Sequence, residues 1–340
     1  MATIIEYIKP LLQGESLSFE QATSLQDIVF EGEVPEAQIA AFLTAMRVKG
    51  ATAPEVAGLA KSLRNHAVKV HTDIDNLVDI VGTGGAAVKI FNVSTASAFV
   101  AAGAGVHVAK HGNRAITSKC GSADVLEELG VNINPSPEVV AECIRQAHIG
   151  FMFAPMFHPA MKYVQPIRKS LGFRTVFNIL GPLANPADVP ALVLGVAEEE
   201  LLMMMAEALK MLGVRFALIV HNNGLDEIST AGITKITELK DSRISDREIN
   251  PKDLGFETAD IDRLKVTDAK TSAKIITDIL TGKETGEGKD IVVLNAAAGV
   301  IAGGLADDFA PAVELAESSI SDGKAMDSLE KLIQISNRTS

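Results

Sequence analysis

The sequence predicts an α/β protein in which a small all-helical domain joins a larger α/β domain with a mostly parallel central sheet. Three observations lead to this prediction. Residues 1–74 show helical spacing with no strand pattern, short apolar runs alternate with helical stretches after residue 77, and the C-terminal third is again mainly helical. Strands that alternate with helices typically form a parallel sheet covered on both faces.

The helical domain is predicted from apolar residues spaced three and four positions apart. This pattern runs through residues 19–30, 35–50 and 52–67, with Pro54 near a helix start, where its missing N–H costs little. A further helical run, residues 158–172, lies in mid-chain. We expect residues 1–74 to form the helical domain, rejoined by about 160–185, with residues 75–159 and 186–340 forming the α/β domain.

The α/β domain is predicted from apolar runs of strand length at residues 77–81, 106–109, 149–154, 191–196 and 215–220. Helical stretches are expected at residues 94–105, 121–130, 198–212, 290–304, 311–323 and 325–336. Asn92 or Ser94 is placed to cap the first of these helices.

The composition limits the classes of function. A net charge of −12 over 340 residues argues against a sequence-independent grip on nucleic acid, which needs a basic surface. The isolated cysteines Cys120 and Cys143 suggest a reducing compartment. The N-terminus has no basic leader, and the least polar runs are too short to span a membrane. We therefore expect a cytoplasmic protein that binds neither membranes nor nucleic acid.

Glycines follow the first predicted strand, in a glycine loop defined here as residues 82–86. The stretch "DIVGTGG", residues 79–85, has the order strand, glycine turn, helix, and it continues into "FNVSTAS". Backbone N–H groups of such a loop, together with a helix start, suit a phosphate group. A tight strand-to-helix turn with ordinary capping explains the same residues, so both interpretations remain open.

Two further clusters follow predicted strands. The polar loop, residues 110–122, carries Lys110, Arg114 and Lys119 with several hydroxyl groups, which suits a polyanion such as diphosphate, although a solvated surface loop is the alternative. Asp226 and Glu227 follow the strand at residues 215–220. Adjacent carboxylates at a strand end suit Mg²⁺ shared with substrate phosphates. Taken alone, this pair is better explained as an ordinary acidic turn.

Taken together, these stretches resemble the anthranilate phosphoribosyltransferase family. The resemblance rests on "GTGG" with "FNVSTAS", "VAKHGNRAITSKCGSADVLEELGV", "HPAMKYVQPIRKSLGFRTVFNILGPLANP", "GLDEIST" and the N-terminal "QIAAFLTAMRVKGAT", and it covers nearly the whole chain. It implies a fold of the nucleoside phosphorylase and phosphoribosyltransferase type, a homodimer, and two Mg²⁺ ions per subunit. The implied reaction transfers phosphoribosyl from 5-phosphoribosyl diphosphate, the donor, to anthranilate, the acceptor.

The resemblance also implies roles for individual residues. Lys110 would stabilise the leaving diphosphate, and Ser94, Asp226 and Glu227 would bind Mg²⁺. The acceptor would contact Gly82, Asn113, Arg168, His111, His158 and Pro182. The donor would be held by Gly82, Gly85, Ala86, Ile90, Asn92, Val93, Ser94, Thr95, Lys110, His111, Gly112, Asn113, Arg114, Ala115, Ile116, Thr117, Ser118 and Ser122. Without the resemblance, Arg168 is better explained as a surface cation of a helix.

Two positions depart from the family pattern. Ala86 stands where the family normally has Asp, and Ile90 stands where a threonine usually precedes the Phe/Val-Asn pair. Both positions are expected to face the sugar phosphate, and Lys89 between them is positioned to compensate. Two rival interpretations are a pyrimidine nucleoside phosphorylase, which carries a different Lys-His-Ser signature in the glycine region, and a non-enzymatic relative that binds nucleic acid.

Overall fold

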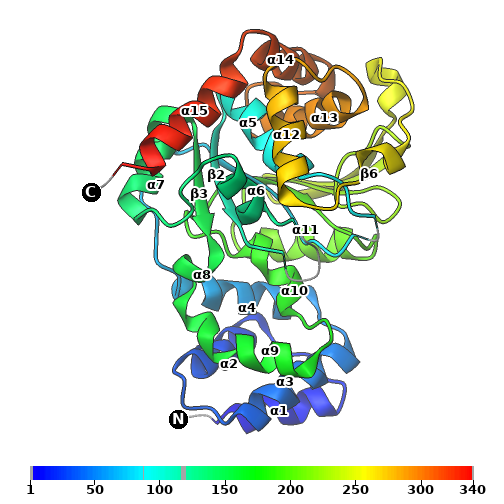
Figure 1. Cartoon of the computed structure of the whole chain (residues 1–340). Helices are drawn as coiled ribbons and strands as arrows, with labels where there is room; N and C mark the ends of the chain where they lie inside the picture. Colours follow the sequence, from blue (N-terminus) through cyan, green and yellow to red (C-terminus); the bar gives the residue numbers. More distant parts are fainter. Residues whose placement is uncertain (1–2, 87, 116–119, 339–340) are drawn as a thin grey trace.

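The computed structural model describes residues 3–86, 88–115 and 120–338, with a helical part at one end and an α/β part at the other (Figure 1). The helical part begins with α1 (Ile4–Leu12), α2 (Phe19–Phe30), α3 (Glu36–Lys49) and α4 (Ala53–Asn65). A capping box starts α2: the Ser18 hydroxyl accepts from the N–H of Gln21 at 3.2 Å, and the Gln21 side chain accepts from the N–H of Ser18 at 2.8 Å.

The described part of the α/β domain is built on a seven-stranded sheet in the order β3-β2-β1-β4-β5-β6-β7. The parallel strands are β1 (Leu77–Gly82), β2 (His107–Gly112), β3 (Ile149–Phe153), β4 (Ala191–Gly195) and β5 (Phe216–His221). The predicted fold class, a helical domain with a mostly parallel α/β domain, is confirmed.

The antiparallel edge of this sheet was not predicted from the sequence. It consists of β6 (Thr234–Lys240), which pairs with β5, and β7 (Arg243–Ile249), which pairs with β6. The hairpin turns at Asp241 and Ser242, which have φ values of 46° and 65°. Tight hairpins usually signal such a turn with Asn-Gly or Asp-Gly, so this turn lacks the usual glycine signal.

Alternate residues of the central strands face two different cores. Leu192 and Leu194 of β4 pack toward α11 (Leu201–Met211) and the N-terminal helices, whereas Val193 packs with the other face. On that other face lie α5 (Val93–Gly103), α13 (Glu287–Ala302) and α15 (Lys324–Ser336). The helices α12 (Ala269–Leu280) and α14 (Phe309–Ser321) pack against them at the same end of the molecule (Figure 1). Outside the mid-chain segment described next, the other elements are α6 (Ser122–Glu128), α7 (Pro137–Ala147), α8 (Ala154–Phe157), η3 (Pro251–Leu254) and η4 (Ile261–Leu264).

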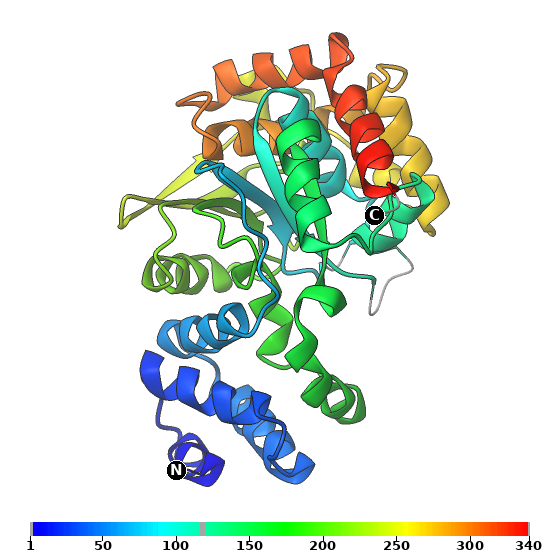
Figure 2. The same ribbon diagram turned by 90° about the vertical axis from the view of Figure 1, so that its left-hand side faces the viewer.

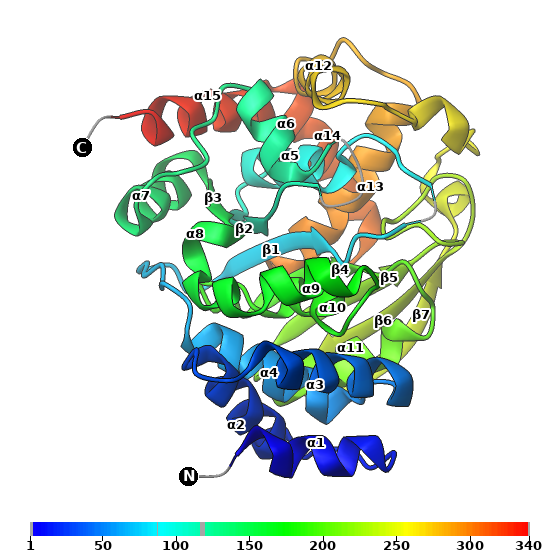
Figure 3. The same cartoon turned by 60° about the horizontal axis from the view of Figure 1, so that its bottom comes forward.

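A mid-chain segment packs against the N-terminal helices (Figures 2 and 3). It contains η1 (Pro159–Tyr163), α9 (Gln165–Leu171), α10 (Phe177–Leu180) and η2 (Gly181–Leu183). Ile167, Phe177 and Leu183 belong to the same apolar core as α1 to α4. The helical run predicted for residues 158–172 is present as two short helices, with Pro159 and Pro166 in their first turns, because proline has no N–H to continue a helical ladder. No helix in the described ranges is long and apolar enough to cross a membrane.

Candidate active site

A cavity of about 440 Å³ lies at the carboxyl ends of β1, β2 and β5, the edge at which ligands bind in open α/β sheets. The glycine loop, the polar loop and the Asp226–Glu227 pair all line it. We call it the first cavity. The predicted site residues that line it are Gly82, Gly85, Ala86, Ile90, Asn92, Ser94, Lys110, His111, Gly112, Asn113, Arg114, Ala115, Ser122, Asp226 and Glu227.

The glycine loop is shaped by close contacts that a side chain would block. Gly84 and Gly85 have φ values of 67° and 83°, in the left-handed region that favours glycine. The N–H of Gly84 donates to Asp226 Oδ2 at 3.0 Å, which ties the loop to the acidic pair. A Cβ at Gly82 would lie 2.5 Å from the same oxygen. Glycine at these positions therefore lets the loop approach the carboxylate of Asp226.

A buried lysine with a buried carboxylate nearby supports the floor of the first cavity. Lys110 is 2% exposed, and its Nζ donates to the carbonyl of Ile80 at 2.5 Å. Burial lowers the pKa of Lys110, while the charges of Asp79 and Glu227 oppose this shift. Burial raises the pKa of Asp79 to about 6, against the charge of Lys110 and hydrogen bonds that include one from Asn185 Nδ2 at 2.7 Å. This network fixes the ammonium group beneath the cavity.

The two adjacent carboxylates form a partly buried negative centre. Burial raises the pKa of Glu227 to about 8, and repulsion from Asp226 adds to the rise, whereas Lys110 and the N–H of Ser94 oppose it. That N–H donates to Glu227 Oε1 at 3.2 Å. Burial also raises the pKa of Asp226. A cation bound between two carboxylates in a cavity would reduce the repulsion between them.

The oxygen ligands present fit Mg²⁺. Asp226, Glu227 and Ser94 offer two carboxylates and a hydroxyl at the cavity wall, and hard cations prefer such ligands. In the described residues no group of three or more His, Cys, Asp or Glu side chains is arranged to hold a metal ion by itself. The fit is therefore to a cation that shares its coordination with substrate oxygens and water.

The start of α5 differs from its prediction. Asn92 occupies the cap position, but neither Asn92 nor Ser94 makes the expected side-chain cap. The Oδ1 of Asn92 instead accepts from Ser272 Oγ at 2.8 Å and from Cys120 Sγ at 2.6 Å. Asn92 thus ties α5 to α12 and to the polar loop. Val93 and Thr95 are 1% and 0% exposed and are not among the described lining of the cavity, so their side chains belong to the core.

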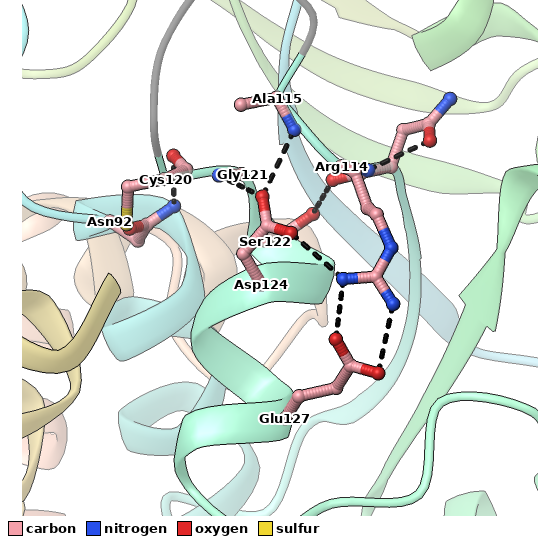
Figure 4. A network of polar contacts seen from close by, with 9 residues as sticks. Asn92, Arg114, Ala115, Cys120, Gly121, Ser122, Asp124 and Glu127 are labelled. Carbon is pink, nitrogen blue, oxygen red and sulfur yellow. Dashed lines mark hydrogen bonds and ion pairs between the residues drawn. The ribbon is translucent and has the colours of Figure 1, made fainter. Parts of the chain in front are cut away.

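The side chains of the polar loop have different surroundings. Asn113, Ala115 and Ser122 line the first cavity, but the Arg114 guanidinium is held by two carboxylates of α6 (Figure 4). It donates to Asp124 Oδ1 at 2.9 Å and to Glu127 at 2.5 and 2.9 Å. These bonds raise the pKa of Arg114 further. Three predicted donor-binding residues lie outside the described ranges: Ile116, Thr117 and Ser118.

A second cavity of about 550 Å³ adjoins the first and shares wall residues with it, among them Gly82, His111 and Asn113. The other predicted acceptor residues, Arg168, His158 and Pro182, line it. The second cavity is therefore bounded by β-strand ends on one side and by the mid-chain segment on the other.

The charged and aromatic groups of the second cavity are few. The Arg168 guanidinium lies 5.5 Å from the ring centroid of Phe177, and Nη1 donates to Gln165 Oε1 at 3.1 Å. The rings of His111 and His158 lie 5.0 Å apart. Burial, with the charge of neighbouring groups, lowers the pKa of His111 to about 3 and that of His158 to about 4. Both imidazoles are consequently neutral at physiological pH, so the positive charges on this wall are those of Arg168, Lys162 and Arg114.

Several residues that the sequence analysis did not single out also line the first cavity. Arg174 and Asn178 reach it from the mid-chain segment, and Thr267 reaches it from the region before α12. The Arg174 guanidinium packs against the Cα of Gly85, where a Cβ would clash with it. No local pattern marks these residues, because they come from chain segments that meet the cavity only through the tertiary fold.

The fold and the site define a glycosyl transferase with a helical bundle domain and an a/b domain. The family described as "Glycosyl transferase family, helical bundle domain" matches residues 5–67, and "Glycosyl transferase family, a/b domain" matches residues 74–326. More narrowly, the chain belongs to the anthranilate phosphoribosyltransferase family. It is 46% identical to the enzyme of that name from Desulforamulus reducens over 334 residues, covering 98% of this chain and 96% of the relative.

Solved structures agree with this assignment. The anthranilate phosphoribosyltransferase (TrpD) from Thermus thermophilus superposes with a TM-score of 0.92 at 40% identity, covering 97% of this chain and 99% of that one. The Saccharomyces cerevisiae enzyme, solved in complex with PRPP and Mg, superposes with a TM-score of 0.89 at 30% identity, covering 98% and 97%. The same architecture thus spans almost the entire length of all three chains.

Proposed function

We propose that this enzyme transfers the phosphoribosyl group of 5-phosphoribosyl diphosphate (PRPP) to anthranilate, giving N-(5-phosphoribosyl)anthranilate and diphosphate, in tryptophan biosynthesis. The observation that supports this most directly is the pair of adjoining cavities. One combines backbone N–H groups, a buried lysine and two carboxylates, and the other presents a guanidinium beside neutral rings. A diphosphate ester with its cation suits the first, and a planar aromatic carboxylate suits the second.

In the proposed reaction, the first cavity holds the diphosphate of the donor, which gains negative charge as it leaves. As the bond from ribose C1 to the diphosphate oxygen breaks, the leaving diphosphate gains negative charge, and Lys110 beneath the cavity stabilises that charge. Mg²⁺, held by Ser94, Asp226 and Glu227, would neutralise charge on the diphosphate oxygens. Glycine-loop N–H groups fix the phosphates in place, so much of the catalysis is positioning.

The acceptor is held by its carboxylate. A guanidinium fork such as that of Arg168 binds a planar carboxylate through paired hydrogen bonds, and His158 and Pro182 lie along the same wall. Asn113 lines both cavities, and we expect the amine nitrogen to meet ribose C1 beside it. The new C1–N bond forms as the amine loses a proton, and an aromatic amine needs no strong base because it is already neutral.

Loss of anthranilate fluorescence on addition of PRPP and Mg²⁺ tests this function. We expect a steady decrease that stops when a chelator is added, and we expect other aromatic amines to react more slowly. No decrease with both substrates and Mg²⁺ present would overturn the proposal. The nucleoside phosphorylase and nucleic-acid-binding alternatives are not favoured, because relatives that share one enzyme name span nearly the whole chain and the net charge is −12.

We also propose a cytoplasmic homodimer that binds two Mg²⁺ ions per subunit, on the basis of the family resemblance. Light scattering coupled to size-exclusion chromatography tests the dimer, with a monomer mass as the contrary result. Titration calorimetry of Mg²⁺ in the presence of PRPP tests the stoichiometry.

A further inference from the structure

Residues 113–115 and 121–122 of the polar loop lie against each other, and we call this contact the neck. A single carboxylate oxygen, Oδ2 of Asp124, accepts from the N–H of Ala115 at 3.1 Å and from the N–H of Gly121 at 2.8 Å (Figure 4). The carbonyl of Asn113 accepts from Ser122 Oγ at 3.3 Å, which adds a second tie across the neck. One side chain of α6 therefore links Ala115 to Gly121.

The neck is closed tightly enough to require glycine at one position. A Cβ on Gly121 would lie 2.6 Å from the carbonyl carbon of Arg114 and 2.7 Å from the carbonyl oxygen of Asn113. The φ of Gly121 is −90°, which any residue adopts, so the reason is space rather than backbone conformation. The two chain segments thus touch directly beside the Asp124 carboxylate.

The second oxygen of Asp124 braces Arg114. Its Oδ1 accepts from Arg114 Nη1 at 2.9 Å, while Glu127 takes both terminal nitrogens of the same guanidinium. The guanidinium also lies 5.6 Å from the ring centroid of Phe153, at the end of β3. With its terminal nitrogens engaged by two carboxylates, Arg114 offers little unbalanced positive charge to a phosphate.

We propose that Asp124 is a positioning residue for the transfer reaction, and that Arg114 acts with it as a brace of the polar loop rather than as a ligand of the donor. This inference rests on the proposed function. Asp124 is not among the described lining of either cavity, whereas the neck residues Asn113, Ala115 and Gly121 line the first cavity. Its effect on the donor is therefore indirect, through the backbone that it holds.

Two substitutions of Asp124 separate its contacts with the neck N–H groups from its contact with Arg114. Asp124→Ala removes the acceptor for both N–H groups and the partner of Arg114. Asp124→Asn retains an amide oxygen that can accept at the neck, but its NH₂ group then faces Arg114 Nη1, donor against donor. Glu128→Gln is the matched control, since Glu128 is an exposed carboxylate of the same helix for which the described residues show no ion pair.

The test measures KM for PRPP and inhibition by inorganic diphosphate, a probe that contacts only the phosphate side. We expect Asp124→Ala to raise both the donor KM and the diphosphate Ki at least tenfold, Asp124→Asn to raise them roughly threefold, and Glu128→Gln to leave them unchanged. A merely structural role would lower the melting temperature without moving these two constants in the folded enzyme.

A double-mutant cycle with Arg114→Ala tests the brace. If Arg114 and Asp124 act through one neck, the double variant will be no worse than Asp124→Ala alone. Fully additive losses would instead make Arg114 an independent donor ligand and overturn that part of the inference. Unchanged donor KM and Ki in Asp124→Asn and Asp124→Ala would overturn the positioning role. Absence of transfer by the wild-type enzyme would count against the proposed function instead.

Discussion

The two cavities of the site are built from different parts of the chain and by different chemistry. The first is formed by loops at the ends of parallel strands and holds buried or partly buried charges, chiefly Lys110, Asp226 and Glu227. The second is closed by the mid-chain segment and holds two neutral imidazoles beside the Arg168 guanidinium, with Arg114 and Lys162 also on its wall. Under the proposed function, the sheet edge would supply electrostatic stabilisation and the helical side would recognise the acceptor.

This division makes the kinetic effects of substitutions separable. Changes around the first cavity should alter turnover and donor binding, and changes around the second should alter acceptor binding. A substitution that moved both KM values equally would show that the two cavities work as one unit.

The largest effect is expected at the acidic pair. Glu227→Gln keeps the shape of the side chain but removes one carboxylate of the cation site, so we expect kcat/KM to fall at least about a hundredfold, as on loss of one charge-stabilising group. The melting temperature without ligands should stay level or rise, because Gln removes a carboxylate whose pKa is raised to about 8 by burial and, secondly, by repulsion from Asp226. Steady-state rates and thermal melts check both expectations.

A Glu227→Gln enzyme with wild-type turnover would contradict the assignment of catalytic charge to the first cavity. If the variant instead melted well below the wild type, the carboxylate would have a structural role. Glu257→Gln provides a control carboxylate, because Glu257 is exposed and is not among the described lining of either cavity.

The second effect is expected at Arg168. A charge-assisted bond is worth about 1.5–3 kcal/mol, so Arg168→Ala should raise the anthranilate KM roughly tenfold or more. The donor KM should change much less, because Arg168 lines only the second cavity among the described walls. Steady-state kinetics with each substrate varied in turn check this, with the exposed Lys169→Ala as a control on the same helix. Equal rises in both KM values would mean that Arg168 supports the cleft as a whole.

Arg168 also shows which part of the site could not be predicted from the sequence pattern alone. The strand ends and their loops were predictable, because apolar runs followed by Gly, Asp or Lys fix both the element and the sheet edge at which it ends. Arg168 lies on a short helix whose spacing indicates only a surface cation. Its place on a cavity wall depends on how the mid-chain segment packs against α3 and α4, which no local pattern encodes.

The same reasoning explains the other differences. The β6–β7 hairpin escaped prediction because its turn at Asp241 and Ser242 has no glycine. Arg114 was expected at the donor phosphates and it lines the first cavity, but its residue type alone cannot reveal that Asp124 and Glu127, ten and thirteen residues later, also hold its guanidinium. Loop cations are thus assigned less reliably than backbone positions, because a long side chain has several possible partners.

A third, smaller effect concerns the neutral imidazoles. Folding lowers the pKa of His158 from its ordinary value of 6.5 to about 4, mainly through burial. Below pH 6.5 the unfolded chain takes up a proton first, so stability is complete above that pH and is lost as the pH falls toward 4. His158→Gln should therefore lose roughly 1–2 kcal/mol less stability than the wild type between pH 7 and pH 5.

Denaturant unfolding of both proteins at pH 7 and pH 5 measures this difference. His66→Gln is a suitable control, since that ring is partly exposed beside Asp27. Identical acid sensitivity of the wild type and His158→Gln would show that the second cavity holds a solvated, chargeable imidazole, which would weaken the contrast between the two cavities. The anthranilate KM of the wild type should also be flat between pH 6 and pH 8.

The smallest effect is expected at Lys89, in the stretch where Ala86 and Ile90 depart from the family pattern. Lys89 is exposed and lines the first cavity, so its ammonium group can reach a phosphate that lacks contacts from residues 86 and 90. Exposed ion pairs contribute at most about 1 kcal/mol, so Lys89→Ala should raise the donor KM roughly two- to fivefold at low salt.

The dependence of the donor KM on salt concentration shows whether the contribution of Lys89 is electrostatic. Added salt should shrink the defect of Lys89→Ala, because the Debye length falls to about 3 Å at 1 M ionic strength. The anthranilate KM should stay constant, and Lys210→Ala, an exposed lysine at the end of α11, should match the wild type throughout. If the donor KM of Lys89→Ala equals that of the wild type at low salt, the glycine loop holds the donor through its backbone N–H groups and the start of α5. The first cavity would then draw its positive charge mainly from Lys110 and Arg174.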